Sequence, residues 1–105
     1  MIKTKVKVLN SQWSILVRSD KVHNKHYPEC HAITHFDSKT IHVRLSSLND
    51  ITVRHELIHA YASEMSLVEL QLDDDQIEEF FCELFAKYGE IIIQDARAIC
   101  RTLSK

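Results

Sequence analysis

The fold is decided by residues 40–65, which read TIHVRLSSLNDITVRHELIHAYASEM. Ile41, Val43 and Leu45 alternate with polar residues, a period of two that predicts a strand with one face buried. After Leu45 the pattern changes. Ser46, Ser47, Asn49 and Asp50 are residues typical of a helix start, and apolar residues then recur at helical spacing, so we expect a helix over 50–65.

The residues before this stretch carry further strand patterns. Segments that alternate apolar with polar residues are 2–9, 12–18, 32–36 and 40–45. They predict two antiparallel hairpins, the first turning at Asn10-Ser11 and the second at residues 37–39. Between the hairpins, residues 19–29 are polar and contain the only proline, so they predict a loop or one irregular helical turn.

The residues after this stretch predict more helix. Asp73-Asp74-Asp75 supplies a helix cap, and Glu78 stands three residues after Asp75 as in a capping box. A helical apolar stripe follows and continues beyond Gly89, the only glycine, which either ends the helix or lies within it. Strands first and helices afterwards is an α+β arrangement, here expected as one domain over 1–105.

The composition excludes several classes of protein. The chain has 105 residues, of which 45% are hydrophobic and 27% charged, enough for one compact domain. No run of apolar residues is long enough for a membrane span, and MIKTKVKVLN lacks the apolar core of a signal peptide. Three cysteines without framework spacing favour a reduced, cytoplasmic compartment, and a net charge of −2 gives no reason to expect a nucleic-acid partner.

The predicted helix over 50–65 contains the sequence His55-Glu56-Leu57-Ile58-His59. Two histidines four residues apart lie one turn apart on one helical face, so both can bind one Zn²⁺. Glu56 lies on the neighbouring side, where a coordinated water would sit. The alternative is an amphipathic helix that happens to carry two surface histidines.

Two glutamates on the next predicted helix favour the zinc interpretation. Glu79 follows His59 by twenty residues and would complete a His₂Glu ligand set, which leaves a fourth position for water. Glu83 lies one turn further on. For Glu83 the alternative is a surface ion pair with Lys87, and for Glu79 it is a solvated carboxylate.

In these two segments the chain resembles a family of enzymes. The HExxH pattern, followed by Glu79 and an acid four residues later, is similar to that of gluzincin, or thermolysin-like, metallopeptidases. VRHELIHAYASE and EEFFCELFAKYG resemble more closely the small phage-encoded metallopeptidase-like proteins related to the ImmA/IrrE-type metallo-endopeptidases. The resemblance implies zinc ligands His55, His59 and Glu79, with Glu83 holding His55 from outside the ligand shell.

The resemblance also implies a reaction. Glu56 would act as general base and acid while zinc activates a water to hydrolyse a peptide bond. An extended peptide or protein substrate would pair with the sheet edge nearest the metal, for which we expect Thr40 to Leu45. The residue types that could stabilise the oxyanion are those of Tyr27, His35, His42 and Tyr88.

Two alternatives concern the remaining features. His23, His26, Cys30 and His31 could be drawn as a second metal site, but their spacing matches no regular pattern and a solvated loop is the better interpretation. The whole protein could instead be a non-catalytic module that zinc stabilises and that binds a regulatory partner. A structural zinc site usually has four protein ligands, so three ligands and an adjacent Glu56 favour catalysis.

Overall fold

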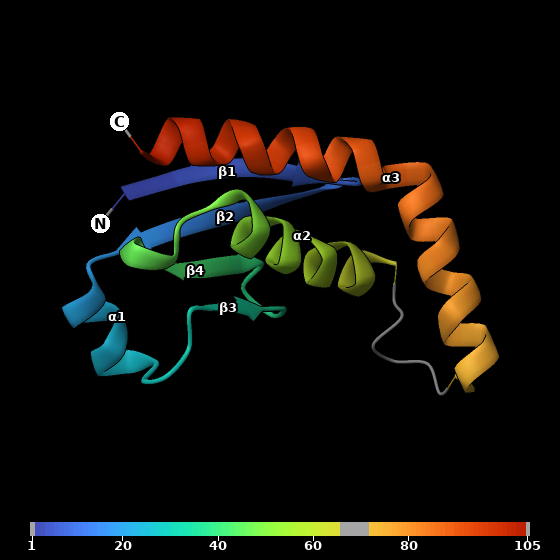
Figure 1. Ribbon diagram of the computed structural model, residues 1–105, viewed down its shortest axis with the longest axis horizontal. Helices are drawn as coiled ribbons and strands as arrows, with labels where there is room; N and C mark the ends of the chain where they lie inside the picture. Colours follow the sequence, from blue (N-terminus) through green and yellow to red (C-terminus); the bar gives the residue numbers. More distant parts are fainter. Residues whose placement is uncertain (1, 66–71, 105) are drawn as a thin grey trace.

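The computed structural model describes residues 2–65 and 72–104, where a four-stranded sheet is followed by two long helices (Figure 1). The strands are β1 (Ile2–Val8), β2 (Ser11–Arg18), β3 (Ala32–His35) and β4 (Thr40–Arg44). The helices are α1 (Asp20–His26), α2 (Asp50–Glu64) and α3 (Asp74–Leu103), with a 3₁₀ turn, η1 (Leu45–Ser47), before α2. The α+β class and both hairpins predicted from the sequence are confirmed.

The sheet is mixed, with the strand order β1-β2-β4-β3. Each hairpin is antiparallel, and the two hairpins join through parallel pairing of β2 with β4. The strand β4 is therefore an interior strand, and the prediction that Thr40 to Leu45 forms the sheet edge is wrong. The edge on that side is β3, because β4 uses its other side to pair with β2.

The hydrophobic core lies between one face of the sheet and the two long helices. In Figure 1, α3 runs along β1 while α2 lies toward the β3 side of the sheet. Fully or nearly fully buried side chains come from all layers and include Trp13, Ile15, Val17, Ile41, Val43, Val53, Leu57, Ala60, Ile92, Ala96, Ile99 and Leu103. The alternation read from the sequence put Ile41 and Val43 on one face, and this is the face that the helices cover.

Helix α1 contacts β4 and carries His23, which is fully buried. Ser19 caps the helix by accepting a hydrogen bond from the Val22 amide. The sequence predicted a loop or one irregular turn here, whereas the structure has a regular helix of seven residues. The prediction failed because so short a helix has too few apolar positions to show a period.

Helix α2 is fixed to the sheet at its C-terminal end by Glu64. The Glu64 carboxylate accepts hydrogen bonds from Ser11 Oγ at 2.6 Å and Trp13 Nε1 at 3.2 Å. It also lies 3.0 Å from Lys39 Nζ. At the other end Asn49 caps the helix by accepting a 2.9 Å bond from the Thr52 amide. Both ends of α2 are thus held, which fixes the rotation of the helix that carries the HExxH motif.

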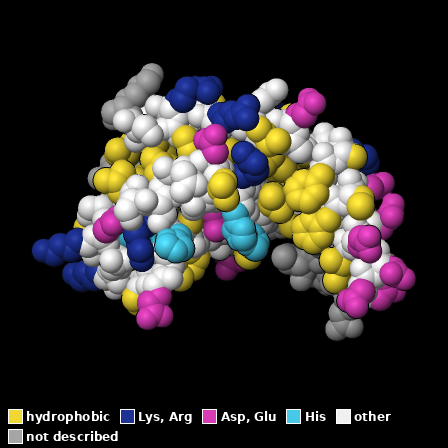
Figure 2. Space-filling model, viewed as in Figure 1, with side chains coloured by type: hydrophobic (Ala, Val, Ile, Leu, Met, Phe, Trp, Pro, Cys, Tyr) yellow, Lys and Arg dark blue, Asp and Glu magenta, His cyan; other side chains and the backbone are white. Residues whose placement is uncertain are grey.

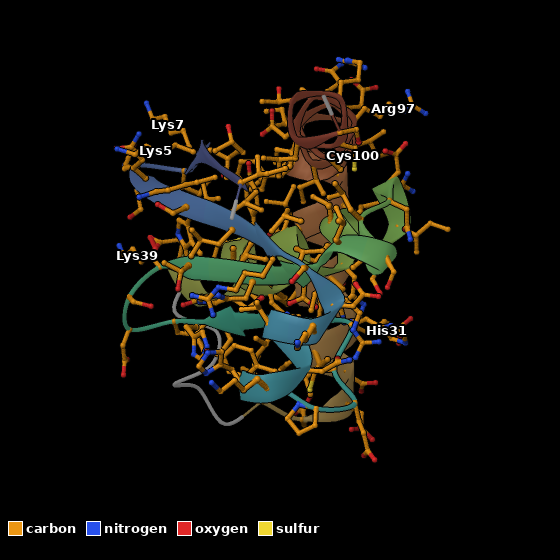
Figure 3. All side chains as sticks on the ribbon, turned by 90° about the vertical axis from the view of Figure 1, so that its left-hand side faces the viewer. Lys5, Lys7, His31, Lys39, Arg97 and Cys100 are labelled. Atoms are coloured by element: carbon orange, nitrogen blue, oxygen red, sulfur yellow. The ribbon has the colours of Figure 1, made fainter. Side chains whose placement is uncertain are left out.

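Helix α3 begins with a capping box formed by Asp73 and Gln76. The box lies two residues before the predicted pair of Asp75 and Glu78. Gly89 lies inside the helix, and Figure 1 shows the helix bending between its two halves. No helix among residues 2–65 and 72–104 is both long and apolar enough to cross a bilayer. Figure 3 shows Lys5 and Lys7 projecting from β1 on the opposite side of the molecule from His31.

Candidate metal and catalytic site

The rings of the two motif histidines lie close together. His55 and His59 are both exposed on α2, and their Nε2 atoms lie 3.2 Å apart. Two nitrogens bound to one tetrahedral zinc at 2.0–2.1 Å are separated by about 3.3 Å. The distance also permits a hydrogen bond between a donor ring and an acceptor ring. The separation of the two Nε2 atoms is therefore compatible both with two ligands of one metal ion and with a direct hydrogen bond.

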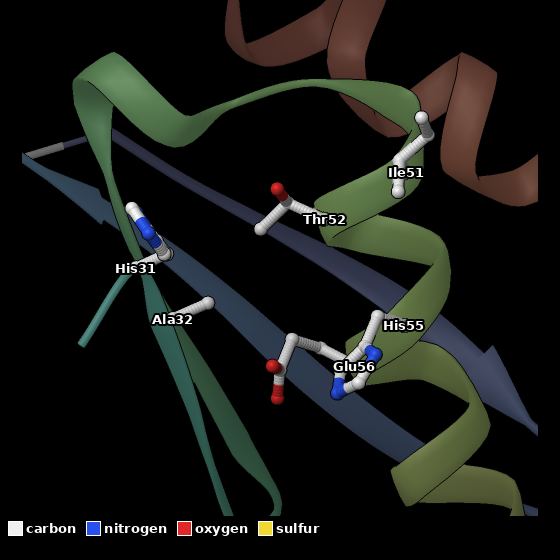
Figure 4. Close-up of a pocket in the computed structure, with 6 residues that line it drawn as sticks. All are labelled: His31, Ala32, Ile51, Thr52, His55 and Glu56. Carbon is white, nitrogen blue, oxygen red and sulfur yellow. The ribbon is translucent and has the colours of Figure 1, made fainter.

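The motif glutamate points toward the sheet. Glu56 is only 7% exposed, and its Oε2 accepts a short hydrogen bond from Thr34 Oγ1 on β3. Figure 4 shows its carboxylate reaching from α2 toward β3, with His55 beside it. A carboxylate this buried is costly unless it is hydrogen-bonded. The Thr34 hydroxyl therefore both stabilises Glu56 and fixes its direction.

A groove runs between β3 and α2 and contains two hollows, one toward each end of α2. The first, the N-terminal hollow, has a volume of about 320 Å³ and is lined by His31, Ala32, Ile51, Thr52, His55 and Glu56 (Figure 4). The second, the C-terminal hollow, has about 330 Å³ and is lined by Ala32, Ile33, Thr34, Phe36, His55, Glu56 and His59. Because both hollows share Glu56 and His55, these two residues stand at the middle of the groove. Figure 2 shows histidine and hydrophobic side chains together on this face of the molecule.

The two glutamates of α3 do not join this group. Glu79 and Glu83 are exposed, and Glu83 Oε2 lies 3.9 Å from Lys87 Nζ, as the surface-pair alternative expects. Within the described parts of the chain, no three His, Cys, Asp or Glu side chains are close enough to hold a metal ion. The structure thus brings together His55, Glu56 and His59 alone, and these fit two zinc ligands and an adjacent base. The roles of Glu79 and Glu83 stay predictions.

The residues named for the oxyanion lie elsewhere. His35 and His42 project from the opposite face of the sheet to Thr34, because successive side chains of a strand alternate. There Tyr27 Oη lies 2.9 Å from His35 Nε2, and the His35 and His42 rings are 5.1 Å apart. Tyr88 packs on Tyr61, with ring centroids 5.4 Å apart.

The residues considered for a second metal site make separate hydrogen bonds. His23 Nε2 is 2.8 Å from the Cys30 carbonyl oxygen, and His31 Nδ1 is 2.9 Å from Ser47 Oγ. His26 is exposed at the end of α1. The interpretation of this segment as a solvated loop is wrong for its first part, because His23 and His26 lie on α1 and His23 is fully buried.

Sequence reasoning missed Thr34. In the predicted strand over 32–36, Ala32 and Thr34 share a face, and the structure pairs Thr34 with the buried Ile41. A hydroxyl on the inward face of a strand needs a hydrogen-bond partner. A threonine at an inward position of the predicted strand was therefore the feature of the sequence that could have indicated such a contact. The sequence did not identify that partner as Glu56, because the contact joins residues 22 positions apart.

Comparison with known protein families, with curated proteins and with solved structures finds no match.

Proposed function

We propose that the protein is a zinc-dependent peptidase with His55 and His59 as metal ligands and Glu56 as general base and acid. The observation that supports it most is the convergence of the two Nε2 atoms at 3.2 Å beside a buried carboxylate. Glu79 is proposed as the third ligand on its spacing alone, with Glu83 as the carboxylate that holds His55. The three cysteines are free, in keeping with a cytoplasmic protein, and the resemblance suggests phage origin.

In the proposed reaction, the metal and the side chains of the protein have different roles. Zinc supplies a Lewis acid that lowers the pKa of a coordinated water and polarises a peptide carbonyl. Glu56, held by Thr34, takes the proton of the attacking water and delivers it to the leaving amine. Because its other oxygen accepts no bond from the described residues, that oxygen is available for the proton transfer.

The substrate is proposed to lie along β3. This strand is the sheet edge that faces α2, so within residues 2–65 and 72–104 no strand pairs with its outer side. An extended peptide can add to such an edge through main-chain hydrogen bonds. Its scissile bond would then pass between β3 and the side chains of His55, Glu56 and His59.

The metal assignment predicts the zinc content of the purified protein. The wild type should hold about one zinc per chain, and His59→Ala and Glu79→Ala should each lose it, because either change removes one of three donors. His26→Ala and Glu90→Ala are matched controls, since both residues are exposed and lie outside the groove. Elemental analysis after dialysis gives the result. If only His59→Ala lost zinc, a residue other than Glu79 would be the third ligand. Zinc retained in both variants would refute the metal site.

The role of Glu56 predicts a separation of binding from catalysis. Glu56→Gln should keep zinc and fold but lose peptide hydrolysis, because the amide cannot accept the water proton. Activity should be measured as the appearance of new amino termini from a denatured protein substrate. Hydrolysis at the wild-type rate by Glu56→Gln would place the chemistry elsewhere. Zinc binding by a wild type that cleaves nothing would instead favour the non-catalytic, zinc-stabilised module.

A further inference from the structure

The groove has a hydrophobic side chain at each end. Ile51, on the first turn of α2, is 75% exposed and lines the N-terminal hollow. Phe36, directly after β3, is 40% exposed and lines the C-terminal hollow. A single exposed hydrophobic residue is ordinary on a protein surface. Two that stand on opposite sides of Glu56, at the ends of one groove, are placed to contact the same extended ligand.

The size and charge of the hollows restrict that ligand. At about 320 and 330 Å³ each is at the lower end of the range for ligand pockets, ~300–1,000 Å³, so each has room for a large side chain. The described residues that line them include no Lys or Arg to bind an acidic side chain. Ala32, Ile33, Phe36 and Ile51 give the two hollows apolar walls. Neutral, hydrophobic side chains fit both hollows best.

We propose that the groove selects peptides with a hydrophobic side chain on each side of the scissile bond, and that Ile51 and Phe36 are its specificity-determining residues. The proposal rests on the function proposed above, because it takes Glu56 as the point of cleavage.

The test compares cleavage by the zinc-loaded wild type, Ile51→Glu and Phe36→Ala. The probe is a mixture of short synthetic peptides in which every residue type occurs on both sides of many bonds, with products identified by mass spectrometry. A glutamate is tolerated in the first turn of a helix, so Ile51→Glu should fold. Ile91→Glu and Phe85→Ala are matched controls, being exposed at 47% and 50% on α3.

The wild type should cleave between hydrophobic residues. Ile51→Glu should lower kcat/KM for these peptides at least about tenfold and raise it for peptides with Lys or Arg on one side of the bond. Phe36→Ala should lower kcat/KM for peptides whose hydrophobic residue lies on the other side of the bond. Ile91→Glu and Phe85→Ala should match the wild type. Cleavage without hydrophobic preference, or an unchanged preference in Ile51→Glu, would overturn the proposal and leave the peptidase function standing.

A second measurement separates the two proposals if no cleavage occurs. A fluorescein-labelled peptide with leucine on both sides of its central bond is titrated with Glu56→Gln protein, and anisotropy reports binding. Binding that Ile51→Glu weakens about tenfold or more would support the groove while the peptidase function fails. Binding that is absent, or that Ile51→Glu does not change, would overturn the proposal.

Discussion

Thr34 links the edge strand to the side chain on which the proposed reaction depends. Its hydroxyl donates to Glu56, which is 7% exposed, and it is the one described residue that hydrogen-bonds this carboxylate. A hydrogen bond to a charged group contributes about 1.5–3 kcal/mol, more than a neutral one. The position of Glu56 in the groove therefore depends on a residue of another element.

The Thr34 contact predicts a loss of stability in one variant but not in another. Thr34→Val keeps the shape of the side chain but removes the donor, so the free energy of unfolding should fall by about 1–3 kcal/mol. Thr34→Ser keeps the hydroxyl and should lose much less. Urea denaturation at pH 7 gives both values, with Thr4→Val on β1 as a control for the substitution itself. Equal stability of Thr34→Val and the wild type would show that the bond contributes nothing.

Individual side chains could be predicted from the sequence where local geometry decides their position. The spacing of His55 and His59 predicted their convergence, because one turn of helix fixes it. The position of Glu79 could not be predicted in the same way. It depends on how the first half of α3 packs, and such packing joins residues far apart in the chain.

At the level of whole elements, α3 contains one residue that disfavours a helix. Gly89 lies inside a helix of 30 residues. A Cβ added there would come no closer than 3.9 Å to its nearest neighbour, Phe85 Cβ, which is ordinary van der Waals contact. Alanine therefore fits this position, and glycine is less favourable in a helix interior by about 0.5–1 kcal/mol.

We expect Gly89→Ala to stabilise the protein by up to about 1 kcal/mol, because alanine loses less backbone entropy on folding. Thermal unfolding followed by circular dichroism measures the change. Ala86→Gly, at an exposed position one turn earlier, should lower the free energy of unfolding by a similar amount. It serves as the reference for an alanine–glycine exchange in this helix. A destabilising Gly89→Ala would mean that the bend of α3 needs a backbone conformation that alanine resists.

The elements were predictable from sequence more reliably than their order in the sheet. Alternation and helical spacing act within a few residues, so the strands and α2 appear at or near their predicted bounds. The order of the strands in the sheet depends on contacts between residues far apart in the chain. Here β4 pairs with β2, which places Ile15 beside Ile41 and Val17 beside Val43. The inward residues of β4, Ile41 and Val43, are fully buried, whereas Ala32 and Thr34 of β3 are only partly buried. This difference favours β4 as the interior strand, and the expectation of β4 at the edge did not take it into account.

Across the whole molecule, the sheet separates two environments. The face toward α2 carries the groove and Glu56, whereas the other face carries a cluster of aromatic and histidine rings beside α1. His42 lies in this cluster at 8% exposure, and its Nδ1 is buried without a hydrogen-bond partner among the described residues. Burial, helped by the charges of Arg18 and the neighbouring histidines His35, His23 and His26, lowers the pKa of His42 from 6.5 to about 4.

This shift predicts that the protein is less stable in weak acid. In the unfolded chain His42 takes up a proton below about pH 6.5, whereas in the folded protein it does so only below about pH 4. Between these values the unfolded state binds more protons, so stability falls as the pH falls and levels off below about 4. The loss due to His42 should be of the order of 2–3 kcal/mol.

Replacing His42 by a ring that does not titrate tests this origin. His42→Phe should reduce the fall in unfolding free energy between pH 6.5 and pH 4, as measured by urea denaturation at a series of pH values. Carboxylates also titrate in this range, so the informative quantity is the difference between variant and wild type. His31→Gln, at an exposed position outside this cluster, should keep the wild-type slope. An equal slope in His42→Phe and the wild type would show that a group other than His42 carries the acid sensitivity of the fold.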